Sequence, residues 1–184
     1  IYLKDISKNF LNESITDCVL TVPAYFDEKA RSGIMRSAFL AGFNVRRLIN
    51  EPTAAAFAYG LEKKRRGIFL VYDLGGGTFD VSLLKLSDGI FKVIGSSGEA
   101  NLGGDDFDYL FAKKMLMNNL KLDIGQLDNS DQINIVKQFK FIKEELSKKN
   151  SFQKEIILKN KKIKTNFDLS DLDSSISHLV NKTI

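Results

Sequence analysis

Apolar residues are spaced along the chain in patterns that alternate between helix and strand. Leu3, Ile6 and Phe10 recur at helical spacing and predict an amphipathic helix over residues 1–12. A nearly all-apolar run, Thr16 to Val22, then predicts a strand that is buried on both faces, as in sheets covered by helices. This alternation continues and predicts an α/β fold.

The remaining elements follow from the same patterns and from the residues that end them. Predicted helices begin near residues 27, 52, 104, 130 and 170, predicted strands cover 45–49, 68–72, 79–84 and 90–94, and a small hairpin covers 153–167. Gly42 ends the helix that starts at residue 27, and Asp88 with Gly89 predicts a tight turn. Ser170 is a candidate helix cap, and residues 63–67 form a basic, solvated turn.

The most informative stretch is the glycine run at residues 75–77, which joins two predicted strands. A turn without Cβ atoms lets its N–H groups approach an anion closely. Asp73 and Asp80 flank the turn and suit a hydrated divalent cation, while Thr78 adds a hydroxyl group. The stretch predicts a hairpin that holds the phosphates and magnesium of a nucleotide. The alternative is a plain glycine turn with two solvated aspartates.

Two further stretches place polar groups at helix starts. Glu51 lies between a predicted strand and the helix that Pro52 opens, where functional groups of α/β sheets are usually found. The alternative for Glu51 is a carboxylate that the helix dipole stabilises. Gly103 and Gly104 precede another helix, and we expect its first N–H groups to face an anion.

Composition narrows the classes of protein. The chain has 184 residues, of which 43% are apolar, and no apolar run approaches the roughly 20 residues of a membrane span. A single cysteine, Cys18, and a single histidine, His178, argue against a disulfide framework and a zinc site. We expect Cys18 to be a buried, inert thiol in a reducing compartment.

Positive charge is concentrated in residues 137–164, which carry ten Lys and three Glu. Such a segment raises the hypothesis of nucleic-acid binding. Its aromatic residues Phe139, Phe141 and Phe152 fall at positions that helix and strand packing explain, without the pattern of a base-stacking platform. A solvated lysine-rich face is favoured, with no nucleic-acid partner.

Several stretches together resemble the ATPase domain of the seventy-kilodalton heat-shock chaperones, members of the actin-like ATPase superfamily. They are VPAYF at 22–26, INEPTAAA at 49–56 with AYGL at 58–61, DLGGGTFD at 73–80 and LGGDDFD at 102–108. The resemblance implies an actin-like (ribonuclease-H-like) α/β fold with two lobes and a nucleotide cleft. Residues 1–61 would be the end of lobe one and 62–184 much of lobe two, with its outer subdomain at about 110–184. The chain would then be a piece of a longer protein.

The resemblance also implies the roles of single residues. Catalytic residues would be Glu51, which helps orient the attacking water, with Asp73, Thr78 and Asp80. Nucleotide-binding residues would be Gly75, Gly76, Gly77, Thr78, Gly103, Gly104, Lys143 and Ser147. Asp73 and Asp80 would hold magnesium through water, and Pro23 and Arg31 would relay the nucleotide state to a peptide-binding domain. Lys140 departs from the family, which usually has an adenosine-contacting glutamate there.

The implied function is ATP hydrolysis, with ATP and magnesium, coupled to the binding of an unfolded or scaffold-protein peptide. The implied partners are that client, a J-domain co-chaperone and a nucleotide-exchange factor, with no membrane, in the cytoplasm or an equivalent reducing organelle matrix. The family's first phosphate loop and catalytic lysine would lie before residue 1. The 184 residues alone are therefore expected to hydrolyse no ATP, because charge stabilisation on one side of the phosphate would be absent.

Two details are similar to the iron–sulfur-cluster-assembly branch of the family. The loop at residues 86–91 is short, and Gly-Glu-Ala-Asn at 98–101 replaces the threonine–histidine pair of general chaperones. Two alternatives remain open. One is a non-catalytic interaction module, and the other is a metabolic kinase of the same superfamily, for which no substrate-hydroxyl base or sugar-facing polar cluster is found.

Overall fold

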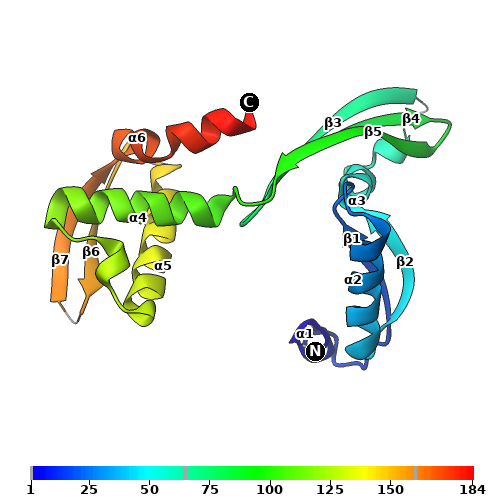
Figure 1. Cartoon of the computed structure of the whole chain (residues 1–184), viewed down its shortest axis with the longest axis horizontal. Helices are drawn as coiled ribbons and strands as arrows, with labels where there is room; N and C mark the ends of the chain where they lie inside the picture. Colours follow the sequence, from blue (N-terminus) through cyan, green and yellow to red (C-terminus); the bar gives the residue numbers. More distant parts are fainter. Residues whose placement is uncertain (1, 64–65, 160) are drawn as a thin grey trace. The chain divides into compact units, whose positions relative to one another are not determined.

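The computed structural model describes residues 2–63, 66–159 and 161–184 (Figure 1). It divides into two compact units, Ile1–Asp73 with Asp80–Ser97, and Leu74–Phe79 with Gly98–Ile184. The three-stranded sheet is thus grouped largely with the residues that precede it. The predicted lobe two, residues 62–184, would instead group the sheet with the residues that follow it. The predicted lobe boundaries remain a prediction. None of the helices in the described ranges combines the length and apolar composition needed to cross a bilayer.

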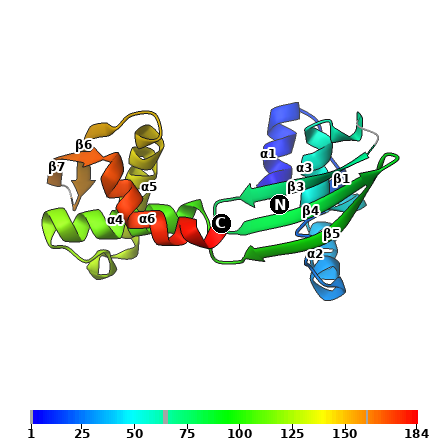
Figure 2. The same ribbon diagram turned by 90° about the horizontal axis from the view of Figure 1, so that it is seen from above.

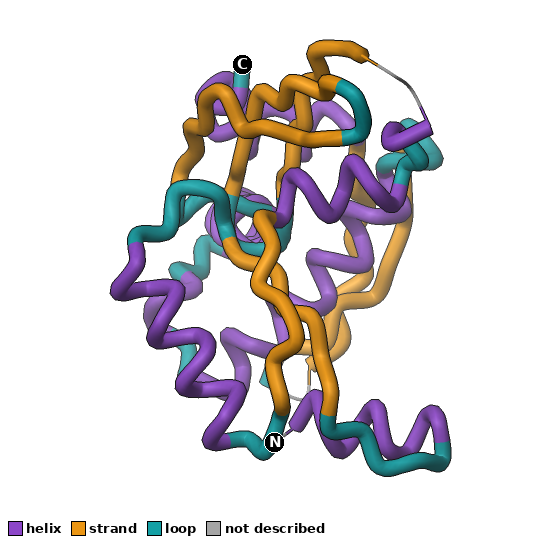
Figure 3. The backbone as a smooth tube through the Cα atoms, turned by 90° about the vertical axis from the view of Figure 1, so that its right-hand side faces the viewer, coloured by secondary structure: helices purple, strands orange, loops and turns teal. Residues whose placement is uncertain are grey.

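The first unit begins with alternating helices and strands (Figure 3). They are α1 (Tyr2–Leu11), β1 (Asp17–Val22), α2 (Glu28–Leu40), β2 (Asn44–Asn50), α3 (Glu51–Ala58) and the short η1 (Leu61–Lys63). β1 and β2 form a parallel pair joined through α2, and Val22 pairs with Asn50 at the carboxyl ends of the strands. Gly42 follows α2 with φ of +79°, which confirms it as the helix end.

Two expectations about β1 are wrong. Val22 is its only buried residue, and the side of the strand that carries Val19 is exposed. Cys18 is partly exposed, and not a buried thiol. Within the described ranges β1 and β2 form a two-stranded sheet, and the helices of this unit leave the face that carries Val19 uncovered.

The same unit contains most of a three-stranded sheet with the order β3-β4-β5, formed by β3 (Arg66–Leu74), β4 (Phe79–Ser87) and β5 (Ile90–Glu99) (Figure 2). Asp88 and Gly89 have φ of +49° and +82°, which confirms the predicted tight turn. β5 continues past residue 94, where the apolar pattern ends. Of the predicted basic turn, Lys64 and Arg65 lie outside the described residues, and the expectation that it extends to Gly67 is wrong, because β3 already begins at Arg66.

The second unit contains three helices around a small hairpin. Its elements are α4 (Gly104–Leu120), η2 (Ile124–Gln126), α5 (Asn129–Leu146), β6 (Ser151–Leu158), β7 (Lys161–Asp168), α6 (Leu169–Val180) and η3 (Asn181–Thr183). β6 and β7 pair antiparallel with Ile156 opposite Ile163, as the predicted hairpin requires. Phe111, Phe139 and Phe167 are fully buried and pack edge to face at the centre of the core.

The start of α6 corrects the predicted cap. The N-cap residue is Asp168 and not Ser170, and the Asp171 carboxylate accepts a hydrogen bond of 3.1 Å from the Asp168 amide. β7 leads directly into the helix, so the chain turns two residues earlier than the hydroxyl suggested. An acidic side chain near the helix start also interacts favourably with the dipole.

Candidate functional site

Glu51 owes its place to the end of the parallel sheet. Val22 and Asn50 are the last paired residues of β1 and β2, so Pro23 and Glu51 are the next residues of their strands. Glu51 also begins α3, with Pro52 in the first turn. The carboxyl end of a parallel sheet is where α/β proteins place their binding groups.

The two aspartates of the hairpin reach the same place. Glu51, Asp73 and Asp80 line one cleft within the first unit, which Pro23, Ala24, Pro52, Val71 and Ser82 complete. Ser82 is buried, and its hydroxyl lies 3.1 Å from that of Ser96 on β5. Carboxylates from α3, β3 and β4 are thus gathered by tertiary packing, although Glu51 and Asp73 are 22 positions apart in the sequence.

The cleft concentrates negative charge. Partial burial raises the pKa of Glu51 above its ordinary value, and the charges of Asp80 and Asp73 raise it further. The pKa of Tyr25 is also raised, first by burial and then by Asp80 and Glu51. A cation bound in this cleft would relieve the repulsion among the three carboxylates.

The glycine turn, residues 75–77, belongs to the second unit. The Gly75 amide donates to the Thr78 carbonyl at 2.9 Å, which closes the turn. The amides of Gly104 and Asp105 donate to the carbonyls of Gly75 and Gly76, at 2.9 and 2.7 Å. The expectation that these two amides face an anion is therefore wrong, because the start of α4 uses them to brace the turn. The resemblance implies that Thr78 acts in one catalytic site with Glu51, and this stays a prediction.

Gly103 allows this close approach. A Cβ atom at residue 103 would lie 2.3 Å from the carbonyl oxygen of Gly76 and 2.6 Å from the Gly77 nitrogen. Backbone atoms cannot yield as a flexible side chain can, so a side chain here would displace the turn. Packing against the glycine turn thus explains Gly103, the N-cap residue of α4, whereas a Cβ atom at residue 104 would make only ordinary contacts.

Lys143 on α5 reaches the same helix start. Its ammonium group lies 2.6 Å from the Asp108 carboxylate and donates a hydrogen bond of 3.2 Å to the Gly104 carbonyl. Ser147 caps α5, and its hydroxyl donates to the Lys143 carbonyl at 3.1 Å. Sequence reasoning did not single out Asp108. The signal was its spacing, because Asp108 falls on the buried face of α4 with Phe111 and Met115.

The sequence profile of the Hsp70 protein family matches residues 1–184, the whole chain. The chain belongs to the Hsp70 family. It is 45% identical over all of its 184 residues to the chaperone protein HscA homolog of Rickettsia prowazekii (strain Madrid E), and covers 28% of that protein. It is 51% identical over 148 residues, 80% of the chain, to the chaperone protein HscA of Buchnera aphidicola subsp. Schizaphis graminum, and covers 24% of it. The chain therefore spans about a quarter of the length of these relatives.

In this Hsp70-family chain, Arg31 fixes the segment that follows β1. Its guanidinium donates to the carbonyls of Phe26 and Ala24, at 2.9 and 3.3 Å, and to the Asn50 side-chain oxygen at 2.8 Å. Asn50 directly precedes Glu51. Arg31 thus links the turn that begins at Pro23 to the strand end that carries Glu51, and sequence reasoning had missed Asn50 as the acceptor.

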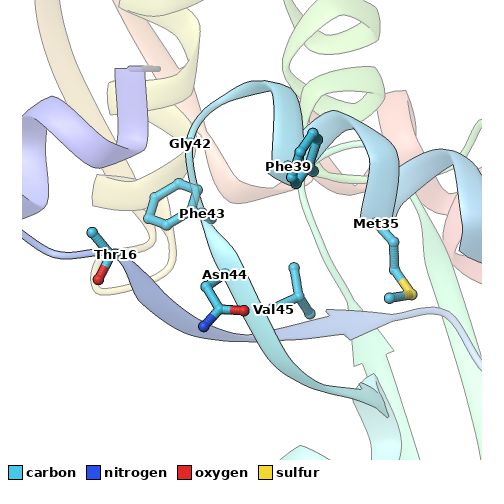
Figure 4. A pocket seen from close by; sticks show the side chains of 7 residues that line it. All are labelled: Thr16, Met35, Phe39, Gly42, Phe43, Asn44 and Val45. Atoms are coloured by element: carbon cyan, nitrogen blue, oxygen red, sulfur yellow. The ribbon is translucent and has the colours of Figure 1, made fainter.

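A second pocket of the first unit lies away from the acids (Figure 4). Its volume is about 540 Å³, and Thr16, Met35, Phe39, Gly42, Phe43, Asn44 and Val45 line it. Figure 4 shows the Met35 and Phe39 side chains coming from α2 and that of Val45 from β2. None of these seven residues has an ionisable side chain, so the lining offers no charged group to a phosphate or a metal ion.

The acidic cleft of the Hsp70-family chain fits a hydrated magnesium ion better than a fully coordinated metal. Among the described residues, no group of three or more His, Cys, Asp or Glu side chains is arranged to hold a metal ion alone. Magnesium is usually bound by one or two carboxylates, several waters and substrate phosphates. Two aspartate carboxylates beside a third acid supply that oxygen chemistry.

Proposed function

We propose that this Hsp70-family chain is part of the ATP-binding and ATP-hydrolysing domain of a molecular chaperone. The observation that carries the proposal is the cleft in which Glu51, Asp73 and Asp80 meet at the end of the parallel sheet. Gathered acids are unfavourable unless a cation or a reaction uses them. The glycine turn lies between Asp73 and Asp80 in the sequence, where phosphates would meet that cation.

Each residue of the site has a proposed task. Asp73 and Asp80 hold the waters of a magnesium ion, which when bound neutralises phosphate charge. Glu51 orients the attacking water, because its carboxylate is at the strand end and its raised pKa favours interaction with a proton donor. The backbone of Gly75, Gly76 and Gly77 and the Thr78 hydroxyl contact the terminal phosphates. Gly103, Gly104, Lys143 and Ser147 line the nucleotide side.

The actin-like fold and its division into lobes belong to the same proposal. Residues 1–61 complete lobe one, residues 62–184 form much of lobe two, and its outer subdomain starts near residue 110. The brace between α4 and the glycine turn supports this arrangement, since it connects the predicted phosphate turn to the outer subdomain. Pro23 and Arg31 would carry the nucleotide state toward a peptide-binding domain, and the bonds of Arg31 to the segment before Glu51 support that role.

We also propose that the full-length protein serves iron–sulfur cluster assembly. The similarity to proteins named HscA, the short turn between β4 and β5 and residues 98–101 support this branch. The client would be a peptide of a scaffold protein, and the partners would be a J-domain co-chaperone and a nucleotide-exchange factor. A scaffold-protein peptide that stimulates phosphate release more than an unrelated unfolded peptide would support this assignment, and equal stimulation would contradict it.

Magnesium-dependent phosphate release by the full-length protein tests the ATPase proposal. Asp80→Asn should slow release about 10²-fold or more, because a preorganised charge is removed at the reacting phosphate. Asp88→Asn makes the same chemical change at the other end of β4, in a turn that tolerates Asn, and should leave the rate unchanged. Equal rates for the two variants, or no ATP hydrolysis by the wild-type protein, would overturn the proposal.

A further inference from the structure

Asp108 is a buried acid for which the proposed ATPase chemistry has no use. Asp108 is 1% exposed, and it lies on the face of α4 that packs into the core of the second unit. Burial raises the pKa of Asp108, and the nearby Lys143 ammonium opposes that shift. A buried carboxylate without a partner would be strongly unfavourable, so its place in the fold requires an explanation.

Lys143 is its partner. The Lys143 ammonium lies 2.6 Å from Asp108 Oδ1, and its hydrogen bond and its charge both lower the pKa of Asp108 against the effect of burial. The same ammonium donates a hydrogen bond of 3.2 Å to the Gly104 carbonyl. Asp108 and the Gly104 carbonyl therefore share one ammonium group.

Gly104 is thereby held from both sides. Its carbonyl accepts from Lys143, and its amide donates to the Gly75 carbonyl at 2.9 Å. A continuous series of contacts thus runs from Asp108 through Lys143 and Gly104 to the glycine turn, all within the second unit. Each member fixes the next, and hydrogen bonds in such a series strengthen one another in a low-dielectric site.

We propose that Asp108 is a positioning residue that keeps Lys143 on the Gly104 carbonyl and so holds the glycine turn in its binding geometry. The proposal rests on the proposed function, in which this turn contacts the phosphates. Buried ion pairs often add little stability compared with apolar residues of similar volume. What this pair supplies is a fixed position for Gly104, whose amide and carbonyl both make hydrogen bonds.

Amide hydrogen exchange on the 184-residue chain, without nucleotide, tests the positioning role. Asp108→Asn should speed exchange of the Gly104 and Asp105 amides about tenfold, as the loss of one supporting hydrogen bond predicts. The Phe139 amide in the core should not change. Lys140→Met removes a positive charge from α5, one turn before Lys143, and should leave the exchange rate of the Gly104 amide unchanged. Unchanged exchange in Asp108→Asn, or equal acceleration in Lys140→Met, would overturn the proposal.

A double variant separates positioning from simple charge compensation and covers a single variant that does not fold. Asp108→Asn combined with Lys143→Met removes both charges, so the midpoint of urea unfolding should return toward that of the wild type. Exchange of the Gly104 and Asp105 amides should stay faster than in the wild type, because the hydrogen bond from Lys143 to the Gly104 carbonyl is then missing. If protection returned together with stability, the pair would only be balancing charge, and the positioning role would be wrong.

ADP affinity of the full-length protein tests whether the positioning of Gly104 by Asp108 and Lys143 matters for nucleotide binding. Asp108→Asn should weaken binding about tenfold, whereas Asp131→Asn, the same change in the first turn of α5, should not. A wild-type protein that binds no ADP would overturn the proposed function and leave the exchange result standing. A variant with loosened Gly104 and Asp105 amides but unchanged ADP affinity would overturn the positioning role alone.

Discussion

The two units differ in how they treat apolar and acidic side chains. In the second unit, Ile135, Phe139 and Ile142 of α5 are fully buried, and the acid Asp108 is buried against a lysine. In the first unit, α2 buries only Ala38, and many of its large apolar residues are exposed. Its acids share a cleft in which neighbouring carboxylates raise the pKa of Glu51.

This difference indicates that the two units serve different purposes. The core of the second unit holds side chains in fixed positions, including Lys143, which bonds to the Gly104 carbonyl beside the predicted phosphate turn. The cleft of the first unit brings together carboxylates that repel one another, so a bound cation would stabilise it. Elements with few buried apolar residues also open at lower free energy, as ligand-binding regions commonly do.

The largest expected effect concerns the core of the second unit. Phe139→Ala should lower the free energy of unfolding by about 3–5 kcal/mol, because it removes a buried ring that two other rings contact. Phe39→Ala, at a phenylalanine of α2 that is 75% exposed, should change it by less than about 0.5 kcal/mol. Urea unfolding measures both. Similar losses for the two variants would break the contrast between the units.

Next in size is the effect of removing two side chains that are proposed to act in catalysis. In the full-length protein, Glu51→Gln and Thr78→Ala should slow ATP hydrolysis by about 10²–10³-fold, the usual loss when one positioned group is removed. ATP binding should weaken less, because these groups are proposed to act on the water and the terminal phosphate. Single-turnover rates and equilibrium binding separate the two quantities. Full turnover with poor binding would contradict the assigned roles.

A smaller effect is expected at the contact between α4 and the glycine turn. Gly103→Ala should destabilise the second unit by about 1–3 kcal/mol, because its Cβ would overlap the Gly76 backbone. Gly95→Ala in β5, where a Cβ meets nothing within 4 Å, is the matched control and should change stability little. Thermal unfolding compares them. A fully stable Gly103→Ala variant would show that the turn can move away from α4.

The smallest effect is a pH dependence. Folding raises the pKa of Glu51, so as pH rises the unfolded state loses this proton first and stability falls until the folded state has also lost it. Glu51→Gln should therefore be more stable than the wild type at about pH 7, where the Glu51 carboxyl is ionised. At about pH 3 the two proteins should be equally stable. A variant that is less stable at neutral pH would show that the Glu51 carboxylate stabilises the fold.

The sequence predicted most elements of both units because their signals are local. The helix end at Gly42, the turn at Asp88 and Gly89 and the hairpin formed by β6 and β7 all depend on residues within a few positions of each other. The cap of α6 was placed two residues late, since an acid and a hydroxyl compete for the same task there. The burial of β1 was misjudged, because burial depends on how many strands and helices surround it.

The sequence by itself also determined which residues could do chemistry, since the glycine run, its flanking acids and Glu51 are visible as residue types at telling positions. Only the tertiary structure decided that Glu51 shares a cleft with Asp73 and Asp80, and that the first amides of α4 serve the glycine turn. It also decided that Asp108 meets Lys143, 35 positions further along the chain. Contacts between distant residues depend on how whole elements pack, and the spacing of residue types along one segment does not specify that packing.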